Sequence, residues 1–468
     1  MKIVRHFNID FVEKLIPLLV LLSLSTACNQ WVIDPEVRIG LILLIGILSF
    51  ITIFSKPILG VYVVSVVSIV FSPSINIGFV NLYFHQWIIL LALLASLSSG
   101  FILGNVHHNI KSGINIPMMV FVGSLLVSLS HAPNMLTGVK SFLYIGVFIS
   151  SYYLILLCVN KEDHLRVFVG LLIITTSIVC VISLGYHSSG RLGSFVLRNP
   201  NSFGNFLALL IPFSISFLLY GRLARGKKLF LTFLFVLMFV NLVLTFSRSA
   251  WIGVFVGILC LVVLKPRVPL VLLMCGIIGS VLLVSPIQKR LFKDINDPGA
   301  QYRVVKAKIA YEKFKDHPVL GNGLGSFHYE SQFSDIWAYR AHSTLENNYL
   351  LMLAEGGIIE FLAFLYLIIV LGKKARVFLR RVSDPFLYSV LLGSLMSIIA
   401  TLAAGMFEDT LFFPKNNWLI GMFMGIVIVV GRMHKELSIT GDSIEVGAEG
   451  KEYPLQTGIA RDHGTDLG

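Results

Sequence analysis

Charged residues are scarce in this sequence. Asp, Glu, Lys and Arg together make up only 13% of its 468 residues, whereas 56% are hydrophobic, and the mean hydropathy is +0.83. So few polar side chains cannot cover the surface of a soluble globule, and the same composition excludes a disordered chain, a coiled coil and a fibre. The sequence instead contains a long series of apolar runs, separated by clusters of Gly, Pro, Asn and charged residues.

Cysteine is also rare. All five cysteines lie in apolar runs, without a CxxC pair or a His-rich ligand spacing: Cys28, Cys158, Cys180, Cys260 and Cys275. We therefore expect small core or lipid-facing side chains, and neither a metal site nor a disulfide framework.

The apolar runs predict membrane-spanning helices. A bilayer core takes about 20 apolar residues per helix, and shorter runs are tolerated in a large bundle. Dividing the sequence at its polar clusters gives the spans 14–28, 38–54, 57–71, 83–104, 115–131, 141–159, 165–185, 204–220, 229–246, 250–264, 268–285, 346–371, 386–406 and 416–431. This predicts an all-α polytopic membrane protein with roughly 12–14 transmembrane helices, since short early runs could pair as re-entrant segments. The first run ends in Ser25-Thr26-Ala27-Cys28, like a lipoprotein signal, but we expect a retained first helix.

Membrane orientation accounts for the net charge of +12. Basic residues collect in loops on one side of the predicted helices, and such loops stay in the cytoplasm. The main loops hold Arg222, Arg225, Lys227 and Lys228; Lys265 and Arg267; Lys373, Lys374, Arg376, Arg380 and Arg381; and Arg432 with Lys435. Both termini are therefore predicted to be cytoplasmic, and membrane lipids, not nucleic acid, are the expected partners of this charge. The acidic, aperiodic tail 432–468 is expected to be disordered.

Arginines on the opposite side run against the positive-inside rule: Arg191, Arg198, Arg248 and Arg303. A guanidinium forms rigid, bidentate hydrogen bonds and stays protonated, which suits a diphosphate held near the lipid headgroups. The alternative is contact with ordinary lipid phosphates, or pairing with Asp294, Asp297 or Glu408. The functional interpretation is favoured for Arg248, because it lies in a tight turn between two long apolar helices.

The long segment 286–345 is predicted to form a periplasmic loop, with a helix-like stretch at 300–314 and then a GxGxG run, Gly321-Asn322-Gly323-Leu324-Gly325. A nucleotide-binding loop is excluded, because no predicted strand precedes the run and no Gly-Lys-Ser/Thr follows it. Glycines permit tight turns and close backbone approach. Two interpretations therefore stand: the run folds over a substrate, or it returns the chain to the membrane.

His342 and Glu346 follow, four residues apart, and share one face if a helix begins near Ser343. Either side chain is a competent general base toward a sugar hydroxyl at the membrane surface. The alternative is a plain helix start, with Ser343 or Thr344 as the N-cap and Glu346 next to the positive helix end.

Taken in order, these elements resemble the O-antigen ligase and Wzy-type O-antigen polymerase superfamily. The resemblance covers about residues 186–371. It rests on the GRLGSF run at 190–195, RNPN at 198–201, SRSAW at 247–251, the Arg303 helix, HPVLGNGLGSF at 317–327 and ENNYLLMLAEGG at 346–357. It implies a bacterial inner-membrane protein whose periplasmic face moves a glycan from undecaprenyl diphosphate to an acceptor glycan, without a nucleotide sugar, a metal or another cofactor. It also implies that Arg191, Arg248 and Arg303 hold the diphosphate, and we add Arg198 to this set.

One departure from the family bears on the reaction. The pattern of ligases in this family is a His-Asn pair followed after a fixed gap by Gly-x-x-Gly. The positions that resemble it in this sequence are Glu346-Asn347 and Gly357-Ile358-Ile359-Glu360. The family's catalytic His is therefore a Glu here, and the nearest His is His342. This favours a polysaccharide polymerase, with an O-antigen ligase-type transfer to a lipid or protein acceptor as the alternative.

We thus expect Glu346 or His342 to be the catalytic base, and Glu408 and Asn347 to contact the acceptor. Asp409 is a further candidate for acceptor contact. The expected organisation is N-terminal transmembrane helices at 1–185, the ligase/polymerase-like region with its periplasmic loop at 186–431, and the tail. A lipid-linked-glycan transporter is a rival, but it predicts mid-membrane charges, of which the spans contain few besides Glu355 and Glu360. A non-catalytic scaffold is the second rival.

Overall fold

The computed structural model describes residues 53, 56–70, 74–77, 80–103, 112–185, 187–188, 191–193, 199–264, 298–336, 345–412 and 416–449. The predicted spans 14–28 and 268–285 lie outside these residues, as does 38–54 apart from Ile53. The same is true of Cys28 and Cys275, whereas Cys158 and Cys180 are buried and Cys260 is partly buried, all three as free thiols.

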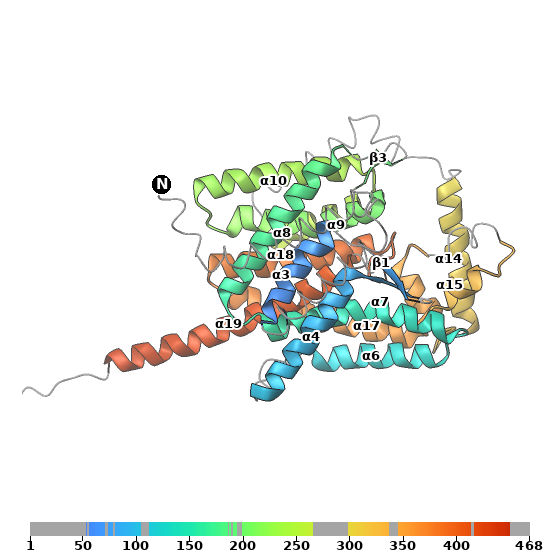
Figure 1. The fold of residues 1–468 in the computed structure, drawn as a ribbon, viewed down its shortest axis with the longest axis horizontal. Helices are drawn as coiled ribbons and strands as arrows, with labels where there is room; N and C mark the ends of the chain where they lie inside the picture. Colours follow the sequence, from blue (N-terminus) through green and yellow to red (C-terminus); the bar gives the residue numbers. More distant parts are fainter. Residues whose placement is uncertain are drawn as a thin grey trace, which may run out of the picture.

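The described part of the chain is a bundle of apolar helices (Figure 1). Seven helices are long and apolar enough to cross a membrane: α7 (Met135–Cys158), α8 (Glu162–Ser183), α9 (Pro200–Tyr220), α10 (Arg225–Leu244), α17 (Asn348–Arg381), α18 (Pro385–Ala404) and α19 (Asn417–Glu449) through its stretch Asn417–His434. Shorter apolar helices are α3 (Ile58–Val70), α4 (Phe84–Leu103), α6 (Asn115–Ser130) and α11 (Arg248–Leu264). The predicted class, an all-α polytopic membrane protein, is confirmed.

Two short antiparallel hairpins accompany the helices. Strand β1 (Ser74–Ile77) pairs with β2 (Val80–Tyr83), and β3 (His187–Ser188) pairs with β4 (Arg191–Leu192), with Ser188 opposite Arg191. Both hairpins sit in links between helices, and neither builds a larger sheet among the described residues.

Local sequence sets where several helices begin. The side chain of Asn199 accepts a hydrogen bond from the N–H of Asn201 at 2.8 Å, and Pro200 occupies the first turn of α9. Asp384 accepts from the N–H of Leu387 at 2.8 Å, directly before Pro385 of α18. An Asn or Asp cap followed by Pro satisfies free N–H groups and presets the backbone, which explains these sharp helix starts.

Helices α9 and α18 form the centre of the bundle. In the membrane-spanning window of α9, 89% of the residues are buried, against 28% in α10. Small residues let α11 approach α18 closely, since a Cβ on Gly253 would lie 2.6 Å from the carbonyl oxygen of Ala400. Phe213 of α9 stacks on Phe423 of α19 with ring centroids 5.0 Å apart. The centre is therefore packed on all sides, whereas α10 presents an apolar face such as membrane lipid covers.

Between α11 and α17, the described residues add two helices at one end of the bundle (Figure 1). Helix α14 (Pro298–Asp316) confirms the helix-like stretch predicted at 300–314, and the short α15 (Ser326–Ser331) follows the GxGxG run. The side of α14 that packs on α17 includes the buried Ala310, in a small cluster with Phe327, Leu345 and Ala354. This cluster holds α14 against the start of α17.

Two helices differ from their predicted limits. Helix α17 extends to Arg381 and is broken at Gly357, where φ is 65° and ψ is −163°. Helix α19 continues to Glu449, past the end predicted at 431, because no proline interrupts the sequence before Pro454 and an existing helix is extended at little cost. Residues 450–468 lie outside the described part of the chain.

Candidate active site

The polar side chains of interest gather where several helix ends meet. Asn201, in the first turn of α9, donates to the carboxylate of Glu408, which follows the end of α18. At the other end of these helices, the hydroxyl of Ser216 in α9 donates to the carbonyl of Ser389 in α18 at 2.9 Å. The loop with Arg222 and Arg225 follows α9 at that end, so the polar cluster and this basic loop lie at opposite ends of the bundle.

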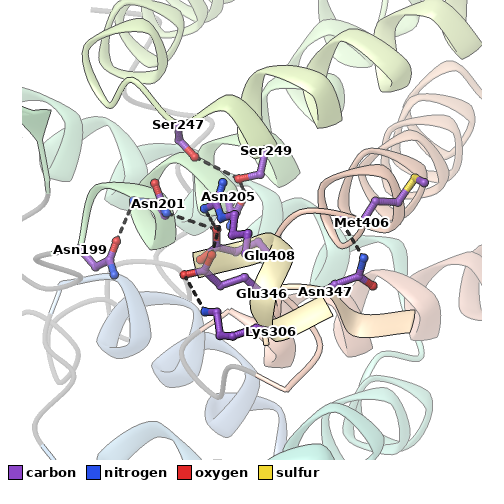
Figure 2. Close-up of polar contacts among 11 residues, drawn as sticks. Asn199, Asn201, Asn205, Ser247, Ser249, Lys306, Glu346, Asn347, Met406 and Glu408 are labelled. Carbon is purple, nitrogen blue, oxygen red and sulfur yellow. Dashed lines mark hydrogen bonds and ion pairs between the residues drawn. The ribbon is translucent and has the colours of Figure 1, made fainter. Parts of the chain in front are cut away.

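Two cations from α14 contact one carboxylate. Arg303 and Lys306 lie about one turn apart on the helix, the Nε of Arg303 donates to Oε2 of Glu346, and the Nζ of Lys306 lies 3.8 Å from Oε1 (Figure 2). The Lys306 side chain is only 1% exposed, whereas that of Arg303 is 35% exposed. Burial lowers the pKa of Lys306, and the neighbouring carboxylate of Glu346 opposes that change. An ammonium is costly to bury unless anions surround it, so Lys306 belongs to this cluster of charges.

Two further acids complete the cluster. Oε2 of Glu408 lies 4.0 Å from the guanidinium of Arg303 and accepts a hydrogen bond from Nδ2 of Asn201 at 3.2 Å. Burial, with a smaller contribution from the nearby carboxylate of Glu346, raises the pKa of Asp409 to about 6 against the opposing effect of Lys306. Figure 2 shows Glu346 and Glu408 adjacent to each other. The cluster therefore combines three acids and two cations, of which Glu346, Glu408 and Arg303 are partly exposed.

Helix α9 also connects this cluster to the turn that carries Arg248. Asn205 lies one turn after Asn201, and its side-chain oxygen is 3.5 Å from the hydroxyl of Ser249. The hydroxyls of Ser247 and Ser249 are 3.2 Å apart on either side of Arg248, which is partly buried at the first position of α11 (Figure 2). The link is tight, with Phe246 at a φ of 49°, as the sequence predicts for a one-turn connection. The first turns of α9 thus hold the Arg248 turn and the charged cluster side by side.

Helix α17 begins at Asn348, two residues after the start of the predicted span 346–371, and the alternative N-cap was wrong. Asn347, not Ser343 or Thr344, is the N-cap, and its side-chain oxygen accepts from the N–H groups of Tyr349 and Leu350 at 3.0 Å each. Glu346 precedes the cap and has a φ of 56°, in the left-handed region. The argument that Glu346 shares a helix face with His342 therefore fails, because Glu346 is not helical. A non-glycine residue in this conformation is strained and is often held so at a functional site.

Asn347 fixes the loop beside it. Its Nδ2 donates to the carbonyl of Met406 at 2.8 Å, and Asn348 bonds Thr410 and Leu411 in the same turn after α18. These bonds hold the turn that presents Glu408 next to the residue that presents Glu346. These bonds use its oxygen and one N–H, and the acceptor contact predicted for Asn347 stays a prediction.

The GxGxG run packs against the break in α17. The N–H groups of Asn322 and Gly323 donate to the carbonyls of Ala354 and Glu355, and the N–H of Ile358 donates to Pro318, at 2.9–3.0 Å. The carboxylate of Glu355 accepts from the N–H groups of Gly325 and Phe327 at 2.9 and 3.1 Å, so it caps α15. Of the two interpretations left open by the sequence, the structure supports the return of the chain to the membrane bundle.

Glycine is required along this contact for steric reasons. Gly321, Gly323 and Gly325 all have positive φ values, 71°, 91° and 77°. A Cβ on Gly321 would lie 2.3 Å from the carbonyl oxygen of Glu355, and one on Gly357 would lie 2.4 Å from that of Val319. The glycines therefore serve close packing of two backbone segments.

The other predicted site residues are only partly described. The backbone of Arg191 lies in β4, which contacts α10, while Arg198 and His342 fall outside the described residues. Sequence reasoning missed Lys306. The available signal was its spacing, since it follows Arg303 by three residues on a predicted helix and so shares its face.

A comparison with known protein families finds a match over part of this region. Residues 233–365 match the family described as O-antigen ligase. This stretch of the chain is similar to the O-antigen ligase family. The match begins within α10 and ends within α17, so it includes the Arg248 turn, α14, the glycine run and Glu346. A comparison with curated proteins finds no match. The family supports an O-antigen ligase- or polymerase-type function of a multi-pass membrane protein that acts on a lipid-linked glycan.

Proposed function

We propose that this protein is a polysaccharide polymerase of the bacterial inner membrane, which transfers a glycan from undecaprenyl diphosphate to an acceptor sugar hydroxyl on the periplasmic face. The observation that carries the proposal is the convergence of Arg303, Lys306, Glu346 and Glu408 at one end of the membrane bundle. Charged side chains at the end of an apolar bundle are expensive unless they serve a ligand or a reaction.

The proposed reaction uses these groups in separate roles. Arg303 and Arg248 bind the diphosphate, together with Arg191 and Arg198 from the segment before α9, and stabilise the negative charge of the leaving group. Glu346 accepts the proton of the acceptor hydroxyl as its oxygen attacks C1 of the donor sugar. The C1–O bond to the diphosphate breaks as the new C1–O bond forms, so the anomeric configuration inverts. His342 remains the alternative base.

Glu408 is proposed to contact the acceptor. Its carboxylate is already oriented by Asn201 and lies next to Glu346, so it can receive a hydrogen bond from a second hydroxyl of the acceptor sugar. Oriented binding of both reactants is a large part of the rate that any transferase gains.

A ligase-type transfer to a lipid or protein acceptor is the second candidate, because the matched family is described as O-antigen ligase. The two reactions share the donor and differ in the acceptor. Glu346 stands at the position of the His in the His-Asn pair of the family's ligases, and this difference favours the polymerase.

A deletion strain complemented with the wild type, with Arg248→Ala or with Glu346→Gln tests the proposal. Lipid-linked intermediates and surface glycan are measured by mass spectrometry and gel. We expect single repeat units to accumulate in the deletion strain and in both variants. Full-length polymer accumulating on the lipid carrier would instead assign the ligase reaction, and an unchanged glycan would remove the enzymatic proposal.

A further inference from the structure

The two oxygens of Glu346 have unequal partners. Oε1 faces Lys306, whose side chain is 1% exposed, and Oε2 accepts from Arg303, whose side chain is 35% exposed. Glu346 itself is 23% exposed. One partner is therefore enclosed by protein, and the other reaches the surface of the protein.

Arg303 is the partner that can be exchanged. Its guanidinium lies near two carboxylates, those of Glu346 and Glu408, and a diphosphate offers more negative charge and more acceptor oxygens than a carboxylate. A donor that binds Arg303 will therefore compete with Glu346 for it. Lys306 is fixed by burial and by the acids around it, Glu346, Asp409 and Glu408, so it has no route to the substrate without leaving its anions.

We propose that Lys306 is the positioning residue of Glu346, and that the donor diphosphate draws Arg303 away from Oε2 so that this oxygen becomes free to accept the proton of the acceptor. This rests on the proposed function and adds an order to it, with the donor bound before the acceptor is deprotonated. Lys306 keeps Oε1 in place throughout.

The first test separates positioning from donor binding. The full-length protein in lipid nanodiscs is assayed with a polyprenyl-diphosphate-linked oligosaccharide, as wild type, Lys306→Met, Lys306→Arg and Arg303→Lys. We expect Lys306→Met to lower kcat about 100-fold with the KM for the donor little changed, as for a lost contribution to proton transfer. Lys306→Arg should restore part of kcat, and Arg303→Lys should raise the KM for the donor.

The matched control is Lys308→Met, because Lys308 lies two residues further along α14 and is exposed. It should leave kcat and KM unchanged. Donor binding by Lys306→Met, measured by titration, shows that the variant is folded. A kcat of Lys306→Met equal to that of the wild type, or a rise in donor KM as large as that of Arg303→Lys, would overturn the positioning role.

The second test addresses the exchange of Arg303. Glu346→Gln removes the charge that competes most strongly with the donor diphosphate for Arg303. This inactive variant should therefore bind the donor more tightly than the wild type does. If Glu346→Gln binds the donor as tightly as the wild type or more weakly, the proposed exchange of Arg303 is overturned. Failure of the proposed function has a different signature: either the wild type transfers no glycan, or Glu346→Gln transfers it at the wild-type rate.

Discussion

The glycine run and the two cations of the charged cluster come from the same segment between α11 and α17, yet the run and the cluster differ in what their polar groups do. In the glycine run, N–H groups and the carboxylate of Glu355 are engaged in bonds that join α15 to the break in α17. In the cluster, Arg303, Glu346 and Glu408 are held close together but remain partly exposed. A glycine motif next to a charged site can therefore serve to hold the surrounding helices in place, while the charged side chains themselves remain available to a ligand.

Replacing the proposed base should have the largest effect. Glu346→Gln keeps the size of the side chain and removes its ability to accept a proton, so we expect transfer to fall about 10³-fold. The variant should lose only part of its thermal stability, because the buried Lys306 loses one neighbouring acid but keeps Asp409 and Glu408 nearby. Glycan transfer in nanodiscs and thermal unfolding in detergent measure the two quantities. Normal transfer by this variant would move the base to His342.

Breaking the glycine contact should give the opposite pattern, a large loss of stability. Gly357→Ala places a Cβ 2.4 Å from the carbonyl oxygen of Val319 at a φ of 65°. We expect a loss of about 3 kcal/mol or more, since both a steric clash and backbone strain arise. Gly372→Ala in the same helix is the matched control, because nothing lies within 4 Å of its Cβ. It should be neutral or stabilise α17 slightly. Equal stability of the two variants would contradict the docking role of the run.

Much of this contrast could be predicted from sequence. Apolar run length predicts the membrane helices. Arg303 could be named because it runs against the positive-inside rule, Glu346 from its spacing and its register with the family pattern, and Glu408 because it lies on the same predicted face. The break at Gly357 could not be predicted, because it depends on Val319 and Gly321, which lie 36 to 38 residues away in sequence. Lys306 was missed for a related reason. Burial of a lysine depends on acids from the turns at 346 and 408–409, and a helical pattern does not reveal which acids will face it.

Arg248 offers a way to sharpen the comparison within the charged region. Arg248→Lys keeps the charge and loses the planar pair of donors, so one charged hydrogen bond to the diphosphate disappears. We expect transfer to fall about 10- to 100-fold, which corresponds to about 1.5–3 kcal/mol. The fall should appear in the KM for the donor or in kcat/KM, while thermal stability changes little. Near-normal glycan length in cells that carry this variant would exclude a bidentate role.

The smallest expected effect is on stability as a function of pH, and it should be confined to the charged cluster. Burial and the neighbouring Glu346 raise the pKa of Asp409 from its ordinary value of 3.8 to about 6. The folded state therefore binds this proton more tightly than the unfolded state, and ionising Asp409 costs stability. Stability should fall as pH rises from about 4 to about 6, by on the order of 1 kcal/mol once solvent screening of this partly exposed group is included.

Asp409→Asn removes this ionisation and should flatten the curve between these pH values, whereas Gly357→Ala should lower stability equally at all of them. Thermal unfolding of both variants in detergent from pH 4 to pH 7 makes the comparison direct. A curve for Asp409→Asn that keeps the wild-type slope would place the titrating group elsewhere. A flattened curve would show that the charged region keeps its acids at a cost in stability, as expected for groups retained for binding and chemistry, and that the glycine contact carries no such cost.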